Sequence, residues 1–193
     1  MAAAGATSPS STASLAQRRV LLCVCGGIAA YKAVELVRRL RDAGAQVQVA
    51  MTANALQVIG APSLQAVSGR SVRSSLWDEA AEAAMGHIEL ARWADLVLVA
   101  PATANTLAKL AHGMADDLVS TLCLATTAPL AVAPAMNHRM WLHPATQANL
   151  ALLRGRGVRV IGPDDGPQAC GEFGPGRLCE PEAIVAALRE PAA

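Results

Sequence analysis

The run VLLCVCGG at residues 20–27 carries an apolar segment directly into two glycines. A short, continuous apolar run of this kind is typical of a strand that is buried on both faces. Residues 28–42 follow with apolar side chains at helical spacing, and residues 45–52 then alternate valine with glutamine, which predicts a helix and a second strand. The order strand, glycine turn, helix and strand indicates a parallel sheet with a right-handed crossover.

The same alternation of strands and helices continues to the C-terminus. Pro101 and Pro134 are expected to end two of the later strands. The pattern predicts a doubly wound α/β fold with one domain over residues 18–193. Residues 162–180 are rich in Gly and Pro and are expected to form a loop that acts as a flap, and residues 1–17 a disordered tail. The further strands are expected at 95–100, 130–133 and 158–161, and the further helices at 103–112, 114–125, 144–154 and 181–189.

The composition excludes several classes of protein. With 53% hydrophobic and 16% charged residues, the 193-residue chain has the composition of a globular domain and not of a disordered chain. Its net charge of +1 argues against bulk electrostatic binding to nucleic acid or to an anionic membrane. Its apolar stretches are interrupted well before the ~20 residues of a membrane span. We therefore expect no nucleic-acid partner and no membrane partner.

The cysteines indicate a reducing compartment. Their number, five, is odd and their spacing is irregular, so a disulfide framework is not expected. The histidines show no metal-ligand spacing with one another, and no metal site is expected. Residues 1–17 lack the basic region and continuous apolar core of a signal peptide. These features favour a cytoplasmic protein, with a weak transit peptide as the open alternative.

Glycine-rich and polar segments follow the predicted strands at one edge of the sheet, where doubly wound folds bind their ligands. Gly26-Gly27 suits a phosphate at a helix start, but neither G-x-G-x-x-G nor G-x-x-x-x-G-K-[ST] is present, and a tight turn explains the pair equally well. Thr103, Asn105 and Thr106 can bind a phosphate or a heterocycle, or they can cap a helix. The segments at this edge are 25–27, 51–52, 101–106 and 134–137.

Three further side chains can carry chemistry, and each has a structural alternative. Asn137 can hold a carboxylate or an amide, or it can shape a turn. His87 can take a proton from a thiol, or it can cap the start of a helix. Cys170 lies among small and rigid residues, where it can donate a proton to a substrate or be an incidental loop cysteine.

Together these segments resemble the flavin-dependent cysteine decarboxylases. The resemblance runs from about Arg18 to the end of the chain, in the family's order. Each motif alone is weak, but PAMN joined to ACGEFGPGR is specific. The segments that carry the resemblance are GGIAAYK at 26–32, GHIEL at 86–90, PATANT at 101–106, PAMN at 134–137 with Met140 and Trp141, and ACGEFGPGR at 169–177.

The resemblance implies a Rossmann-like, flavodoxin-like doubly wound parallel sheet. It also implies an FMN-dependent carboxy-lyase that acts on the carboxylate of a cysteine. The favoured substrate is 4′-phosphopantothenoylcysteine, which would become 4′-phosphopantetheine in coenzyme A biosynthesis. The alternative is the C-terminal cysteine of a precursor peptide, oxidatively decarboxylated to an aminoenethiol in the synthesis of a modified-peptide natural product. The family also assembles as homotrimers, often as dodecamers of four trimers. A flavin-binding regulatory subunit is disfavoured because His87, Asn137 and Cys170 are all present, and the Cys170 loop does not suit a prenyl-transferring flavin enzyme.

The family's site residues carry over onto matching positions of this chain. His87 would take the thiol proton as base, Asn137 would hold the substrate carboxylate, and Cys170 would return a proton as acid. In this chemistry a hydride passes from Cβ to FMN and back, which creates an electron sink for decarboxylation at Cα. Non-covalently bound FMN would contact Gly26, Gly27, Ile28, Thr52, Thr103, Ala104, Asn105, Thr106 and Ala135. Further substrate contacts would be Met136, Ala169 and Gly171.

The end of the chain leaves two expectations open. In many bacteria the family's decarboxylase is fused to the ligase that makes its substrate, whereas this sequence ends at Ala193 without one. It is expected to be either an excised domain or a stand-alone enzyme with a separate ligase partner. The Cys170 loop favours the coenzyme A substrate, because an enzyme that stops at the enethiol does not need this acid. The missing ligase favours the peptide substrate.

Overall fold

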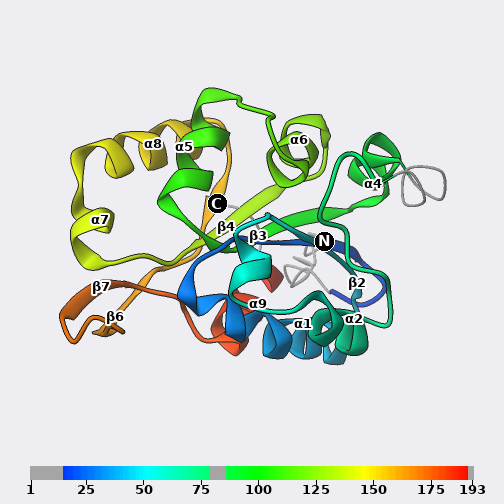
Figure 1. Ribbon diagram of the computed structural model, residues 1–193, viewed down its shortest axis with the longest axis horizontal. Helices are drawn as coiled ribbons and strands as arrows, with labels where there is room; N and C mark the ends of the chain where they lie inside the picture. Colours follow the sequence, from blue (N-terminus) through cyan, green and yellow to red (C-terminus); the bar gives the residue numbers. More distant parts are fainter. Residues whose placement is uncertain (1–14, 79–85, 191–193) are drawn as a thin grey trace, which may run out of the picture.

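Five parallel strands form the centre of the computed structural model, which describes residues 15–78 and 86–190 (Figure 1). Their order is β2-β1-β3-β4-β5, the flavodoxin-like order, and each neighbouring pair is parallel. The predicted fold class is therefore confirmed. The strands are β1 Arg19–Val24, β2 Gln46–Met51, β3 Leu96–Ala102, β4 Leu130–Pro134 and β5 Arg159–Val160.

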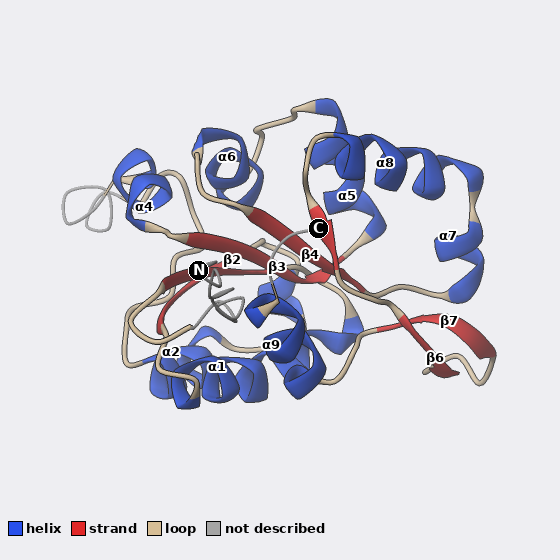
Figure 2. Ribbon diagram, turned by 180° about the vertical axis from the view of Figure 1, so that it is seen from behind, coloured by secondary structure: helices blue, strands red, loops and turns tan. Residues whose placement is uncertain are grey.

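Helices cover both faces of the sheet (Figure 2). One face carries α1 Ala33–Asp42, α2 Ala61–Ser68 and α9 Pro181–Arg189. The other carries α4 His87–Trp93, α5 Ala104–His112, α6 Leu118–Ala125 and α8 Pro144–Gly155. Short helices complete the connections: η1 Ile28–Lys32, η2 Ala55–Gln57 and α7 His138–Leu142. None of the described helices is long and apolar enough to cross a bilayer.

Strand β1 separates two hydrophobic cores. Val20, Leu22 and Val24 face α1, α2 and α9, whereas Leu21 and the two cysteines of the strand run face α4, α5, α6 and α8. All six apolar residues of that run are at most 1% exposed. The continuous apolar pattern therefore marks a strand that is buried on both faces, as expected for a parallel sheet.

The structure departs from the sequence prediction at both ends of the domain. Leu15 is 1% exposed within the first core, and the Gln17 amide donates to the Gly44 carbonyl at 2.8 Å. The expected tail is thus wrong for residues 15–17, because an apolar side chain and a turn contact hold them on the domain. The rest of that segment, 1–14, lies outside the described residues.

The expected loop at residues 162–180 contains an antiparallel hairpin. Its strands are β6 Asp164–Pro167 and β7 Phe173–Arg177. Gly171 has a φ of 83° in the connecting turn. Glycine and proline hid these strands from the sequence reading because neither strand has the apolar alternation that marks a half-buried strand.

Other element boundaries also differ. The helix predicted over residues 28–42 consists of the 3-10 helix η1 followed by α1. Strand β3 continues through Pro101 to Ala102, and its register with β4 shifts between Val99 and Ala102, so the missing proline N–H falls at an irregular strand end. Helix α6 begins at Leu118 and not at residue 114. Asp117 sets this start by a capping box with Ser120, which satisfies the first free amides of the helix.

Candidate functional site

A cavity of about 770 Å³ lies at the carboxyl ends of β1 to β4, between the sheet edge and the hairpin β6–β7. This volume is within the ~300–1,000 Å³ typical of small-molecule and cofactor sites. The four segments predicted to meet at this edge all contribute to its wall. Every residue predicted to contact FMN lines it: Gly26, Gly27, Ile28, Thr52, Thr103, Ala104, Asn105, Thr106 and Ala135.

The two glycines after β1 have different surroundings. A Cβ on Gly26 would lie 2.6 Å from the Asn54 carbonyl carbon and 2.7 Å from its oxygen, so only glycine fits against this backbone. A Cβ on Gly27 would meet no atom closer than the Thr103 methyl, at 3.6 Å. The tight-turn interpretation therefore holds for Gly26, whereas a Cβ on Gly27 would make only ordinary contacts with Thr103, Ala135 and Pro101 at the ends of β3 and β4.

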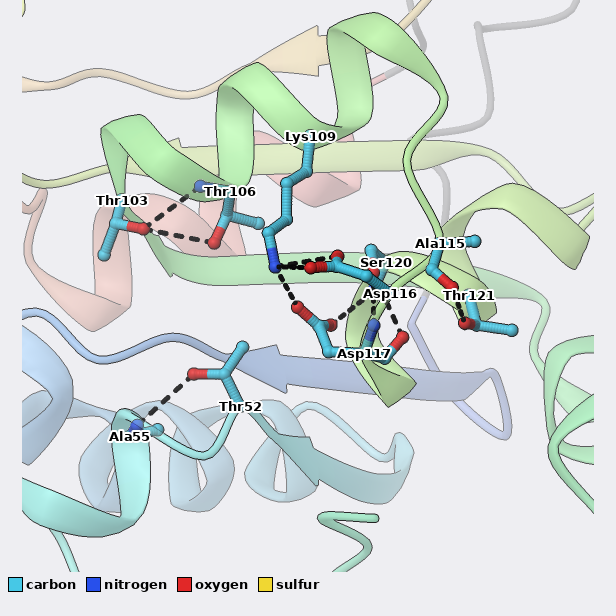
Figure 3. A network of polar contacts seen from close by, with 10 residues as sticks. All are labelled: Thr52, Ala55, Thr103, Thr106, Lys109, Ala115, Asp116, Asp117, Ser120 and Thr121. Atoms are coloured by element: carbon cyan, nitrogen blue, oxygen red, sulfur yellow. Dashed lines mark hydrogen bonds and ion pairs between the residues drawn. The ribbon is translucent and has the colours of Figure 1, made fainter. Parts of the chain in front are cut away.

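The threonines at the start of α5 have a structural task (Figure 3). Thr103 Oγ1 accepts from the Thr106 amide at 3.2 Å and lies 3.1 Å from Thr106 Oγ1, which caps the helix. Asn105 is exposed and lines the cavity without taking part in this cap. On the opposite wall, Thr52 Oγ1 accepts from the Ala55 amide at 3.3 Å.

A charged cluster that the sequence reading missed lies beyond these threonines (Figure 3). Lys109 Nζ contacts Asp116 at 2.8 Å and Asp117 at 2.7 Å, and Lys109 and Asp117 both line the cavity. Hydrogen bonds to the two carboxylates raise the pKa of Lys109. Burial works to raise the pKa of Asp117, but the bonds from Lys109 and Ser120 outweigh it and the pKa is lowered. One ammonium faces two carboxylates, so this end of the cavity does not suit a phosphate.

Asn137 and Cys170, which are distant in the sequence, lie in contact at the hairpin side of the cavity. Asn137 caps α7 by accepting from the Arg139 amide at 2.9 Å, which leaves its Nδ2 directed at the hairpin. Nδ2 lies 3.3 Å from Cys170 Sγ and donates to Glu172 Oε2 at 2.8 Å. The thiol itself donates to the same Glu172 oxygen at 3.4 Å. The structure thus brings the predicted carboxylate binder and the predicted acid together.

The hairpin is seated on the β4–α7 loop by its own polar contacts. Gln168 Oε1 accepts from the His138 amide at 2.9 Å, and Gln168 Nε2 donates to the Pro175 carbonyl at 3.1 Å. The Met136 amide donates to the Gly176 carbonyl at 2.9 Å. Sequence reasoning missed Gln168 and Glu172. The one signal for Glu172 was its place beside Cys170 in the motif, and Gln168 lies directly before that motif.

The cysteines fall into two classes. Cys25, at the end of β1, is buried, and burial raises its pKa to about 12. Burial together with a hydrogen bond to Asp164 also raises the pKa of Cys179 to about 12. Cys170 is the exposed cysteine, and it lines the cavity. It is therefore the thiol best placed to exchange a proton with a bound substrate.

Two predicted site residues are not in the cavity wall. Met136, Ala169, Asn137 and Cys170 line the cavity, but Gly171 and His87 do not. His87 is the first residue of α4 and is half-buried there. Helix α4 and the hairpin lie at opposite ends of the molecule (Figures 1 and 2). Within one chain, the expected base is therefore remote from the expected acid.

Comparison with known proteins gives concordant matches. A family profile described as Flavoprotein matches residues 8–192. The coenzyme A biosynthesis bifunctional protein CoaBC of Escherichia coli K12 is 62% identical over 172 residues, which are 89% of this chain and 42% of that protein. The CoaBC protein of Bacillus subtilis is 48% identical over 171 residues, or 89% and 42%. The chain thus spans less than half the length of these curated relatives.

Solved structures agree with the sequence matches. A PPC decarboxylase variant in complex with pantothenoylaminoethenethiol has a TM-score of 0.79 and 34% identity, covering 90% of this chain and 97% of that one. The FMN-dependent cysteine decarboxylase SpaF has a TM-score of 0.78 and 35% identity, covering 91% and 97%. Both neighbours are named as decarboxylases, and SpaF is named as FMN-dependent.

Proposed function

The chain belongs to the flavoprotein family, and on that premise we propose that it is an FMN-dependent decarboxylase that converts 4′-phosphopantothenoylcysteine to 4′-phosphopantetheine. The observation that carries the proposal is the contact between Asn137 Nδ2 and Cys170 Sγ, 3.3 Å apart, at a cavity lined by every expected FMN contact. A carboxylate binder and a proton donor side by side suit the loss of CO₂ followed by protonation of the same carbon.

The cavity fits FMN in volume and in chemistry. Its wall offers small residues at the end of β1, hydroxyl groups of Thr52 and Thr103, and the exposed amide of Asn105. Gly27, which lines the cavity at the start of η1 and lacks a side chain, is a better place for the phosphate than the acidic cluster of Asp116 and Asp117. When bound, FMN supplies a two-electron acceptor and donor, which no protein side chain provides.

Three side chains of this chain would move protons and hold charge. Asn137 would hold the substrate carboxylate through Nδ2 until CO₂ leaves. Cys170 would then give its proton to the carbon that lost CO₂, and solvent would restore the thiol. His87 would take the proton of the substrate thiol at the start. The net reaction consumes one proton and releases one CO₂.

The position of His87 supports a site shared between copies of the chain. His87 and Cys170 lie at opposite ends of one molecule, so one substrate can meet both only when α4 of a neighbouring copy approaches the cavity. We place the cavity at such an interface, in a homotrimer or in a dodecamer of trimers. Exposed apolar side chains at the cavity rim, Ile28 at 70% and Tyr31 at 63%, are consistent with a covering partner.

The cysteines of the chain support a choice of substrate and of cellular compartment. A peptide decarboxylase that releases an enethiol needs no proton donor at Cys170, and here Cys170 is held against the carboxylate binder. This favours the coenzyme A intermediate and leaves the peptide reaction as the second candidate. A ligase that supplies the substrate would be the partner, and the five free cysteines suit the cytoplasm.

The test is mass spectrometry of 4′-phosphopantothenoylcysteine after incubation with the purified protein and FMN. Loss of CO₂ alone is the expected result. An unchanged substrate, with flavin bound to the protein, would reject this substrate. A peptide that ends in cysteine would then be assayed in the same way, and its oxidative decarboxylation would establish the second candidate.

A further inference from the structure

Glu172 joins the two reacting side chains of the proposed site through a single oxygen. Its Oε2 accepts from Asn137 Nδ2 at 2.8 Å and from Cys170 Sγ at 3.4 Å, and it lies 3.3 Å from His138 Nδ1. Its Oε1 lies 3.9 Å from Arg139 Nε. Two hydrogen-bond donors and two basic side chains thus lie around this carboxylate, although it belongs to an exposed hairpin.

The Asn137 contact places the Glu172 carboxylate on the group proposed to bind the substrate carboxylate. The Oδ1 atom of Asn137 accepts from the Arg139 amide, so Nδ2, which also donates to Gln168 Oε1 at 3.3 Å, is the group left to bind a carboxylate. Glu172 takes the shortest bond to Nδ2. A substrate carboxylate held by Asn137 would compete with Glu172 for this donor and would repel it, because both groups are anionic.

The same contact fixes the position of the acid. Cys170 and Glu172 flank Gly171 in the hairpin turn, and the Gly171 amide donates to the Gln168 carbonyl at 2.9 Å, which keeps the turn tight. With Glu172 hydrogen-bonded to Asn137 Nδ2, Cys170 Sγ lies 3.3 Å from the same nitrogen. Hydrogen bonds from Asn137 and Cys170 lower the pKa of Glu172, so the ionised form makes this contact.

We propose that Glu172 is a positioning residue that takes the place of the departed carboxyl group on Asn137 and so brings Cys170 to the carbon that must be protonated. The inference rests on the proposed decarboxylase function. Before the reaction the substrate carboxylate displaces Glu172 from Asn137. The departing CO₂ is neutral, so Asn137 is freed, and Glu172 returns with Cys170.

The proton transfer then balances without a further reactant. The S–H bond of Cys170 breaks, and the π electrons of the enethiolate form the new C–H bond at Cα, while a sulfur lone pair of the substrate closes a C=S bond. Cys170 keeps its bonding pair as a thiolate. Asn137 Nδ2, at 3.3 Å, is a donor for that thiolate until a proton from water restores the thiol.

The first test uses the FMN-loaded protein and 4′-phosphopantothenoylcysteine. Glu172→Ala and Glu172→Gln are compared with the control Glu182→Ala, whose exposed glutamate pairs with Arg39 at 2.8 Å and does not line the cavity. CO₂ release and the ratio of released enethiol to saturated thiol are measured separately. We expect Glu172→Ala to keep CO₂ release and to raise the enethiol ratio by about tenfold or more, the effect of one lost charge-assisted hydrogen bond. Glu172→Gln, which can still accept from Asn137, should give an intermediate ratio.

An enethiol ratio in Glu172→Ala equal to that of the wild type would overturn the proposal. So would a parallel loss of CO₂ release and of thiol product, because that result describes a merely structural role. If the wild-type protein with FMN releases no CO₂, the proposed function fails and the role of Glu172 falls with it. If the wild type is active and Glu172→Ala leaves the ratio of enethiol to saturated thiol unchanged, the proposed role of Glu172 is wrong and the proposed function stands.

A second readout needs neither FMN nor substrate. Cys170 in the ligand-free chain is alkylated with iodoacetate and with iodoacetamide, and the rates are compared by peptide mass spectrometry. The Glu172 carboxylate, 3.4 Å from the thiol, should slow the anionic reagent selectively. Glu172→Gln should therefore raise the iodoacetate-to-iodoacetamide rate ratio at Cys170, and Glu182→Ala should leave it unchanged. Equal ratios in wild type and Glu172→Gln would contradict the contact on which the proposal depends.

Discussion

Substituting the two glycines after β1 separates packing from ligand access. In Gly26→Ala the new Cβ would lie 2.6 Å from the Asn54 carbonyl carbon, a backbone atom that cannot rotate away. In Gly27→Ala the nearest atom would be the Thr103 methyl at 3.6 Å, an ordinary contact. Both changes stiffen the unfolded chain, which stabilises a protein by about 0.4–1 kcal/mol where the native backbone accepts the residue. The difference in free energy of unfolding between Gly26→Ala and Gly27→Ala therefore measures the cost of the clash at Gly26.

The clash at Gly26 should lower the free energy of unfolding by about 1–3 kcal/mol, the usual range for overpacking a tight site. For a chain of this length each kcal/mol lowers the Tm by about 2–4 °C. Thermal unfolding of both variants without FMN measures this, and Gly27→Ala is expected to match or slightly exceed the wild-type Tm. FMN titration should then show weakened binding in Gly27→Ala, because the added methyl group alters the part of the cavity wall that Gly27 lines. A Gly26→Ala protein as stable as the wild type would refute the packing argument.

Three further predictions test other parts of the account. Thr103→Val should lower the free energy of unfolding by about 0.5–2 kcal/mol, because it removes the side-chain cap of α5, whereas Thr103→Ser should keep most of the stability. Urea unfolding measures both variants, and equal stability of the two would contradict the cap. Arg19 holds the pKa of Asp95 at about 2, below the ordinary 3.8, so the pair should stabilise the fold above pH 3.8 and lose that contribution as the pH falls through about 2. The difference in Tm between wild type and Asp95→Asn should therefore shrink over this pH window. A Tm difference that stays constant with pH would contradict the ion pair's contribution. A site shared between copies takes Cys170 from one copy and His87 from another. We therefore expect the saturated thiol to form again when separately purified His87→Asn and Cys170→Ser proteins exchange subunits. No restoration in a demonstrably mixed oligomer would rule out a shared site.

Local patterns were sufficient to predict the sheet and its binding edge. The run from Val20 to Cys25 is apolar because both faces of β1 are buried, and Gly26 follows because the backbone of Asn54 leaves no room for a side chain. The carboxyl ends of parallel strands share one edge, so the strand order alone predicts that segments such as 101–106 and 134–137 lie together.

Features that depend on distant partners were not predictable in this way. The hairpin β6–β7 pairs glycine-rich strands with no apolar alternation, and its seat on the β4–α7 loop comes from Gln168. Glu172 gained its significance only when the fold placed Asn137 against it, and Lys109 when it placed Asp117 nearby. The remoteness of His87 from the cavity is likewise a property of the fold and not of its motif.

The most direct test of the central claim is the mass of the product that FMN-loaded wild type and Cys170→Ser release from 4′-phosphopantothenoylcysteine. The contact of Cys170 with Asn137 predicts the saturated thiol from the wild type. From Cys170→Ser it predicts CO₂ release with a product that is lighter by two hydrogens, the enethiol. A saturated thiol from Cys170→Ser would contradict the account, because the carbon would then have been protonated without the acid on which the site is built.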